Sequence, residues 1–228
     1  PLNKNVNKHI LLVIDELINT YDIDGLHLDY VRFQDMFYGY NETGIKEFEN
    51  KYNFNPKDID RGLISPRFGY LDSEVDSLTK LWDDYKANSI TNLVKDINTL
   101  VKNNDSSIKL SAAVKPNIIE AKYRWYQDWL SWVKLDLIDF AVVMNYESNI
   151  NKFNFNNRFI KNFFSNLGKQ KIVIGISTFN QNAIDAADKI ILSRLNGFSS
   201  YSLYNYNEKQ LGEKWYDPVI NVFNFNIE

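Results

Sequence analysis

Histidine, aspartate and arginine side chains stand close together in residues 22–32, which read DIDGLHLDYVR. Their apolar neighbours predict a short internal strand, and successive side chains of a strand point to opposite faces. His27 and Asp29 then share one face. A carboxylate at the end of such a strand is stable only where it is hydrogen-bonded or faces a water-filled cleft. We therefore interpret Asp29 as a candidate active-site carboxylate, and His27 as a residue that orients it or binds substrate.

Charged groups near strand ends more often cap the chain or form ion pairs than take part in catalysis. We interpret Asp24, at the entry of this strand, in that structural way. Asp29 is interpreted as catalytic, because a strand of a βα unit brings its last residues to the mouth of a barrel. Tyr30 and Arg32 follow it directly and are candidate substrate-binding residues.

A second carboxylate follows another apolar run. Residues 138–144 turn polar abruptly at Asn145, Tyr146 and Glu147. Parallel strands end at the same edge of a sheet, so this prediction places Glu147 at the edge that carries Asp29. Glycosidic cleavage needs two carboxyl groups, one to protonate the leaving oxygen and one to attack or to activate water. The sequence thus favours Glu147 as the acid and Asp29 as the nucleophile or base, with Asn145 and Tyr146 lining the site.

The other predicted strands also end in polar or aromatic side chains. Lys115 falls on the same face as Ser111 and Ala113. It could fix a substrate hydroxyl or keep a nearby carboxylate ionised, and a solvated lysine explains its position equally well. Tyr204 ends the last strand and is a further candidate for substrate binding.

Composition limits the possible partners. The 228 residues carry a formal net charge of −3 with both signs interspersed, which disfavours nucleic acid as a partner. The chain has no cysteine, two histidines without metal-ligand spacing and no glycine-rich phosphate loop, so we expect no metal and no cofactor. No apolar run is long enough to span a bilayer. The chain starts at Pro1, and we expect it to be a processed product or a piece of a longer polypeptide.

Aromatic residues make up 15% of the chain, with 14 tyrosines among them. Aromatic faces stack on sugar rings, and the tyrosine hydroxyl bonds sugar hydroxyls, so this content favours a carbohydrate as partner. A low-GC genome, which enriches tyrosine and asparagine regardless of function, accounts for it equally well.

Helices and strands are predicted to alternate along a single domain, 1–228, with a long loop insertion at 34–75. This order is typical of parallel strands with helical crossovers, in a doubly wound sheet or a (β/α) barrel. A closed barrel needs eight strands, so three would have to precede Pro1. The predicted strands are 23–31, 107–114, 137–144, 171–176 and 198–203, and the predicted helices are 8–21, 45–52, 75–103, 122–133, 159–167 and 183–195.

Residues 21–33, YDIDGLHLDYVRF, resemble the signature strand of the family-10-like glycosyl hydrolases, which are TIM-barrel proteins. Three weaker blocks agree in order: residues 82–85, residues 127–129 with 138–140, and residues 174–176. The resemblance implies an incomplete α/β TIM-type barrel that holds strands four to eight. It also implies glycoside hydrolysis of a polysaccharide or glycan, and an extracellular or cell-surface location.

Two positions depart from related patterns. Family members usually carry an arginine soon after the tryptophan of the long helix, where this chain has Lys86. Residues 144–147 also resemble the sixth strand of family-18 chitinases, whose fourth strand carries a catalytic glutamate where this chain has Val31. Chitinase-type chemistry is therefore not expected.

Two alternatives to an enzyme stay open. The chain could be a non-catalytic glycan-binding or surface-associated barrel module, or a fragment that needs upstream strands for stability, because five open strands leave two edges exposed. The sugar, its linkage and the oligomeric state are left undetermined.

Overall fold

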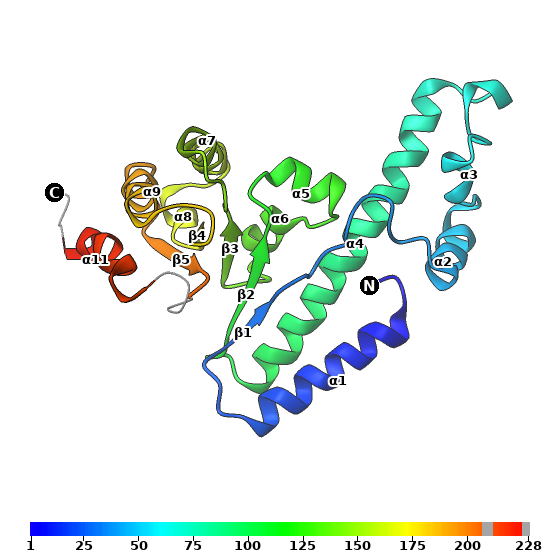
Figure 1. Cartoon of the computed structure of the whole chain (residues 1–228). Coiled ribbons are helices and arrows are strands. Elements are labelled where there is room, and N and C mark those ends of the chain that lie inside the picture. Colours follow the sequence, from blue (N-terminus) through cyan, green and yellow to red (C-terminus); the bar gives the residue numbers. More distant parts are fainter. Residues whose placement is uncertain (207–211, 225–228) are drawn as a thin grey trace. The chain divides into compact units, whose positions relative to one another are not determined.

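The computed structural model describes residues 1–206 and 212–224 and shows a mixed α/β fold (Figure 1). Five strands form one sheet in the order β1-β2-β3-β4-β5, and the pairings from β2 to β5 are parallel. The strands are β1 (Gly25–Leu28), β2 (Lys109–Val114), β3 (Phe140–Met144), β4 (Ile172–Ser177) and β5 (Ser200–Tyr204). The predicted alternation with parallel strands is thus confirmed.

The helices before and between the strands are α1 (Lys4–Thr20), α2 (Glu42–Tyr52), α3 (Lys57–Asp60), η1 (Pro66–Phe68), α4 (Asp72–Asn104), α5 (Ile118–Arg124) and α6 (Trp129–Lys134). Those that follow are α7 (Ile150–Lys161), α8 (Asn166–Lys169), α9 (Ala183–Leu195), η2 (Glu213–Tyr216) and α11 (Asp217–Asn224). Helix α9 has the bounds that the apolar spacing predicts.

The chain forms two compact units, and β1 and β2 contribute residues to both. The first unit holds Pro1–Leu26, Tyr30–Leu110 and Ile119–Asp128, and the second holds His27–Asp29, Ser111–Ile118 and Trp129–Glu228. That the chain is a single domain stays a prediction.

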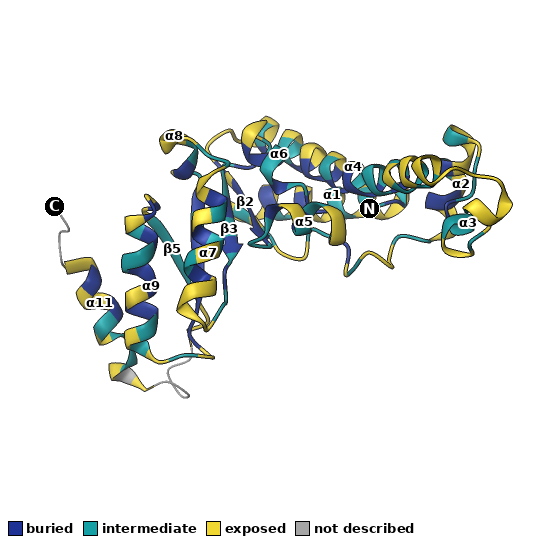
Figure 2. Ribbon diagram, turned by 90° about the horizontal axis from the view of Figure 1, so that it is seen from above, coloured by how far each residue is buried: buried dark blue, intermediate teal, exposed yellow. Residues whose placement is uncertain are grey.

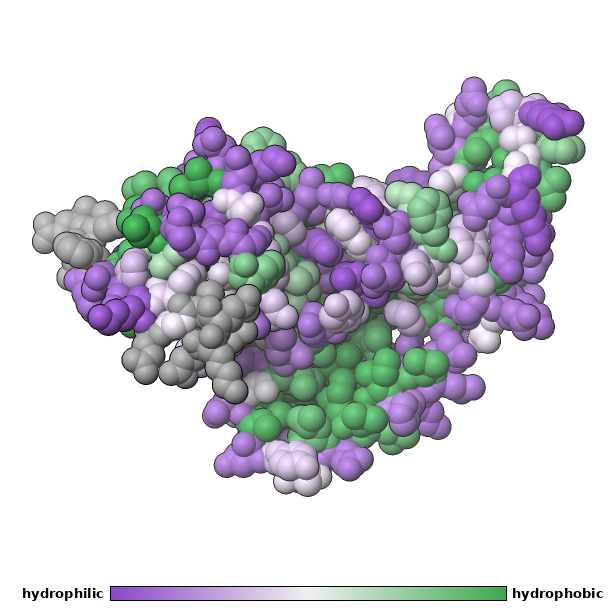
Figure 3. Space-filling model, viewed as in Figure 1, coloured by the Kyte–Doolittle hydropathy of each residue, from purple (hydrophilic) through white to green (hydrophobic). Residues whose placement is uncertain are grey.

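In the first unit, α1 packs along α4. Ile14 and Ile18 are the buried residues of α1, and its first turn is capped by Asn3, whose side chain accepts hydrogen bonds from the next helical amides. A pocket of about 210 Å³ lies between the two helices and is bordered by Leu11, Leu12 and Leu100. Apolar side chains gather on the surface of this region in Figure 3.

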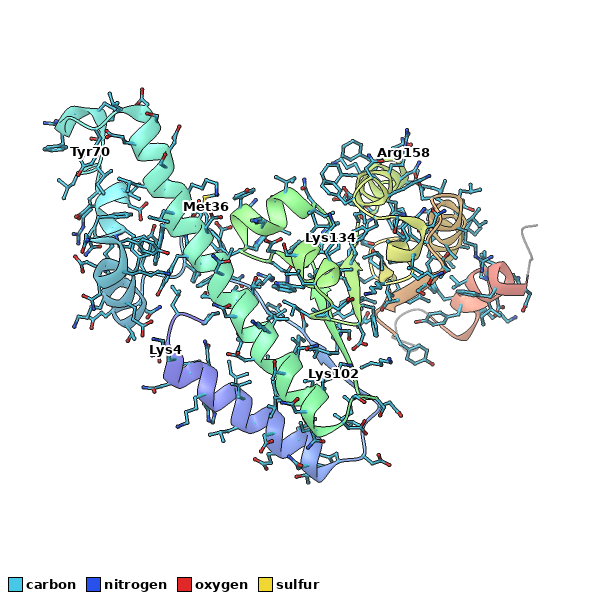
Figure 4. All side chains as sticks on the ribbon, turned by 180° about the vertical axis from the view of Figure 1, so that it is seen from behind. Lys4, Met36, Tyr70, Lys102, Lys134 and Arg158 are labelled. Carbon is cyan, nitrogen blue, oxygen red and sulfur yellow. The ribbon has the colours of Figure 1, made fainter. Side chains whose placement is uncertain are left out.

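The predicted insertion at 34–75 contains α2, α3 and η1 and is anchored to α4. Phe48 is fully buried, with ring centroids 4.8 Å from Trp82 and 5.1 Å from Tyr85. Lys86 of α4 is also buried, and its ammonium donates to the carbonyl oxygen of Met36 at 3.2 Å. Met36 is marked beside α4 in Figure 4. Lys86 therefore ties the insertion to the long helix.

The second unit has its core around β2, β3 and β4. The residues of β2 in this unit are all buried, as the dark strand in Figure 2 shows. Gly175 of β4 lies against β3 so closely that an added Cβ would stand 2.5 Å from the carbonyl oxygen of Val143. Only glycine fits at this position, which explains one residue of the 174–176 block.

Three predicted elements are corrected by the structure. Strand β1 ends at Leu28, because Tyr30 adopts a left-handed backbone conformation with φ of 55°. The helix predicted at 122–133 is two helices, α5 and α6, and Tyr126 between them has φ of 55° as well. An isolated positive φ cannot belong to a regular strand or helix.

The helix predicted near 159–167 begins nine residues earlier, since α7 spans Ile150–Lys161. Asn149 caps it by accepting hydrogen bonds from the amides of Asn151 and Lys152. Phe153 and Ile160 are buried on its inner face. The helical pattern at the start of α7 was not recognised in the sequence, because asparagine, which is frequent in this segment, has a low helix propensity. Helix α11 was not predicted at all.

Candidate functional site

The candidate site lies in the second unit, and its first members come from β1 and β2. The Nδ1 atom of His27 lies 2.8 Å from the Oγ atom of Ser111. Exposed His27 and Asp29 alternate with half-buried Leu26 and Leu28, so the two polar residues share the exposed face, as the period of two predicts. A hydroxyl partner fixes the orientation of the imidazole ring next to the candidate carboxylate.

Asp29 follows β1 directly and acts electrostatically on Tyr146, which follows β3. Burial, with Tyr204 and Asp29 nearby, raises the pKa of the Tyr146 hydroxyl to about 12. A negative charge raises the pKa of a phenol only when it is close, because it disfavours the phenolate. The structure therefore brings together a carboxylate and an aromatic residue from strand ends far apart in the sequence.

Three aromatic rings gather at the carboxyl ends of β3, β4 and β5. The rings of Tyr146 and Tyr204 are stacked, with centroids 5.3 Å apart and planes inclined by 14°. Phe179 stands nearly perpendicular to both, 6.4 Å from each. Phe179 and Tyr204 are about half exposed, at 51% and 53%. This aromatic cluster (Tyr146, Phe179 and Tyr204) offers apolar ring faces and hydroxyls together, which is the surface a sugar ring binds.

Glu147 follows Tyr146 and is half-buried. Its main-chain carbonyl oxygen accepts a hydrogen bond of 2.6 Å from the ammonium of Lys189 on α9. The side chains of Glu147 and Lys189 also interact electrostatically. Sequence reasoning missed Lys189, because it appears as one of several charged residues in an amphipathic helix.

Asn145 is directed into α7. Its amide nitrogen donates to the carbonyl oxygen of Phe153 and to Oδ1 of Asn157, both at 3.0 Å, and its own Oδ1 accepts from Asn156 at 2.9 Å. The side chain is 1% exposed. Asn145 thus positions the loop that carries Tyr146 and Glu147, while its predicted contact with substrate stays a prediction.

The remaining candidates are Lys115, which belongs to the same unit, and Tyr30 and Arg32, which belong to the first unit. Lys115 follows β2 and is half-buried, and its carbonyl oxygen accepts from Trp129 Nε1 at 3.0 Å. Tyr30 and Arg32 belong to the first unit, where the guanidinium lies 5.0 Å from the tyrosine ring centroid. Their substrate-binding roles stay predictions.

Phe179 is a site candidate that sequence reasoning did not single out. The sequence feature that could have identified it is its position in the polar segment that follows β4, between Thr178 and Asn180. Asn180 contributes as well, since its amide donates to the carbonyl oxygen of Tyr146 at 3.0 Å and so joins the loops after β3 and β4.

The described part of the chain shows no clustering of acidic and histidine side chains as metal ligands. Within residues 1–206 and 212–224, no group of three or more such side chains could hold a metal ion. Among the helices in the same part of the chain, none has the length and apolar character needed to cross a membrane.

Parallel strands whose carboxyl ends carry carboxylates and an aromatic cluster make this a mixed α/β protein with its candidate site at one edge of the sheet. A family model described as glycosyl hydrolase-like 10 matches residues 1–190, and the chain belongs to this family. The resemblance found in the sequence is thereby confirmed. The match covers β1 to β4 and most of α9. A comparison with curated proteins finds no match. Membership associates the chain with glycans, and the five-strand sheet is consistent with part of an α/β barrel.

Proposed function

We propose that the chain is the catalytic part of a glycoside hydrolase that acts on a polysaccharide or glycan. The observation that carries this proposal is the exposed aromatic cluster at the carboxyl ends of the parallel strands. The effect of the Asp29 charge on the pKa of Tyr146 supports a carboxylate near this cluster. Family membership supports a glycan as the ligand. We also propose that the five strands are the last five of an eight-stranded barrel. A polysaccharide substrate fits a place of action at or outside the cell surface.

In the proposed reaction, the sugar ring stacks on the aromatic cluster, and His27 orients Asp29 or binds the substrate. The carboxylic acid of Glu147 gives its proton to the glycosidic oxygen as the bond to the anomeric carbon breaks. The carboxylate of Asp29 either attacks that carbon or takes a proton from the water that attacks it. One water is consumed overall, and the separation of the two carboxyl groups decides between retention and inversion.

The test is sugar release from a panel of bacterial and plant polysaccharides by the wild type and by Asp29→Asn. We expect a loss of about 10²- to 10⁴-fold, the usual effect of removing an acid-base group. Asp24→Asn is the matched control, because Asp24 lies before the same strand and its main-chain carbonyl oxygen accepts from the amide of Lys109 at 2.9 Å, a bond that this substitution keeps. Equal loss in both variants would contradict a special role for Asp29.

A non-catalytic glycan-binding module is the second candidate, favoured by the exposed rings of Phe179 and Tyr204. It predicts saturable glycan binding that survives Asp29→Asn and is lost in Tyr204→Ala, with no sugar released by the wild type. This outcome would replace the enzyme proposal, whereas release by the wild type would exclude the module.

A further inference from the structure

Lys189 is a fully buried lysine on α9, with 0% of its surface exposed. Its ammonium donates to the carbonyl oxygen of Glu147 at 2.6 Å and to that of Ser148 at 3.0 Å. It also donates to the side-chain oxygen of Gln181. A lysine ammonium has three donors, so these three acceptors satisfy it completely.

Burying an ammonium group costs free energy that an apolar side chain of similar volume would not. Burial lowers the pKa of Lys189, although the carboxylates of Asp185 and Glu147 act in the opposite direction. A buried charge is tolerated when its hydrogen bonds are satisfied, and an apolar side chain of similar volume would often be at least as stabilising. What Lys189 adds is a constraint on geometry, because its ammonium joins three acceptors from two different loops.

The two loops carry the candidate site. Glu147 and Ser148 belong to the loop after β3, and Gln181 belongs to the loop after β4. Gln181 is itself fixed by donating its amide to the carbonyl oxygen of Ser177 at the end of β4. A chain of hydrogen bonds thus runs from β4 through Gln181 and Lys189 to the main chain of Glu147.

We propose that Lys189 is a positioning residue that fixes the main chain at Glu147 and thereby aims its carboxyl group at the glycosidic oxygen. The inference rests on the proposed hydrolase function. It adds a residue that touches no substrate and acts only through Glu147. A shift of about 1 Å in a catalytic group can lower the rate by about 100-fold, which sets the scale of the effect.

The test compares leaving groups in Lys189→Met and Glu147→Gln. A natural glycan needs a proton on its leaving oxygen, whereas an aryl glycoside with a strongly acidic phenol leaves without one. We expect Lys189→Met to lower kcat on the natural glycan by about 10- to 100-fold and on the activated glycoside by less than about threefold. General destabilisation would lower both rates together.

Lys169→Met is the matched control, because Lys169 is also buried, at 7% exposure, but precedes β4 at the other end of the strand. We expect no difference between leaving groups in this variant. A thermal melt of each variant verifies that it folds.

Rescue provides a second measurement that does not depend on Lys189→Met folding well. The 228 residues contain no cysteine, so Lys189→Cys introduces a single thiol. Alkylating that thiol with bromoethylamine in the unfolded state, followed by refolding, restores an ammonium at nearly the original distance. Recovery of turnover on the natural glycan is the expected result, while alkylation with a neutral group of similar length gives none.

The outcomes separate the two proposals. If Glu147→Gln shows the leaving-group difference and Lys189→Met does not, only the inference about Lys189 is overturned. If neither variant shows it although the wild type is active, Glu147 is not the acid, and the role of Lys189 falls with it. If the wild type releases no sugar, the proposed function itself is wrong, and so is this inference.

Discussion

Ionisation of the Tyr146 hydroxyl is opposed first by burial, and then by the stacked Tyr204 and the charge of Asp29, which together raise its pKa. At neutral pH its hydroxyl therefore stays protonated and can donate a hydrogen bond to a sugar or to a carboxylate. The cluster combines this donor with the exposed face of Phe179. In the proposed function, single residues thus supply both the apolar and the polar part of sugar recognition.

Titration of Tyr146 tests this electrostatic contact. Its pKa of about 12 lies above the ordinary tyrosine value of about 10, so the folded protein keeps the proton after the unfolded chain has lost it. Its contribution to stability is complete below about pH 10 and is lost as the pH rises through 12. We expect the pKa to fall in Asp29→Asn, as measured by NMR of the tyrosine ring carbons with Tyr146→Phe for assignment. An unchanged value would mean that the charge of Asp29 does not reach the hydroxyl.

At the scale of elements, the close approach of β3 and β4 holds the site together. Gly175 pairs with Met144 in the parallel register, immediately before the loop that carries Tyr146. An added Cβ at Gly175 would also stand 3.2 Å from the ring of Tyr146. The absence of a side chain at Gly175 therefore allows both the close approach of β3 and β4 and the position of the Tyr146 ring.

Replacement of this glycine should be costly. Gly175→Ala places a methyl group 2.5 Å from the carbonyl oxygen of Val143, a backbone atom that cannot move without breaking the sheet. We expect a loss of about 1–3 kcal/mol in the free energy of unfolding, measured by urea denaturation. Gly168→Ala in α8 is the comparison, because its nearest neighbour is the ring of Phe164 at 3.3 Å, which can adjust. A loss below about 0.5 kcal/mol in Gly175→Ala would show that the strands separate easily.

For the whole molecule, the weak net charge of −3 matters for how a ligand is recognised. If the proposed function holds, long-range attraction contributes little to glycan binding, and stacking and hydrogen bonds at the strand ends supply the affinity. We therefore expect the proposed hydrolase to bind a neutral glycan rather than an acidic one. It also agrees with the absence of a basic stripe in the sequence.

Salt dependence tests this view. Raising sodium chloride from about 0.1 M to about 1 M shortens the Debye length from about 10 Å to about 3 Å. We expect the affinity for a neutral polysaccharide, measured by calorimetry, to change by less than about twofold, since its contacts are uncharged. A tenfold decrease would instead indicate recognition of a charged group on the glycan.

The sequence by itself determined the order of the main elements, their parallel arrangement and the family. Local patterns carry this information, because apolar periodicity distinguishes the amphipathic helix at 183–195 from the buried strand at 171–176. The placement of polar residues at strand ends also predicted that Asp29 and Glu147 lie at the same edge of the sheet, with Tyr146 lining the site.

Only the tertiary structure decided which side chains serve the site and which serve the scaffold. Asn145 follows the end of its strand as Tyr146 does, yet it bonds into α7, while the tyrosine joins the aromatic cluster. Lys189 could not be recognised in the sequence, because two of its three acceptors lie about forty residues away, in a loop that only the fold brings to α9. The positive φ of Tyr126 likewise depends on packing rather than on local preference. Such contacts are not encoded in spacing, so no periodicity reveals them.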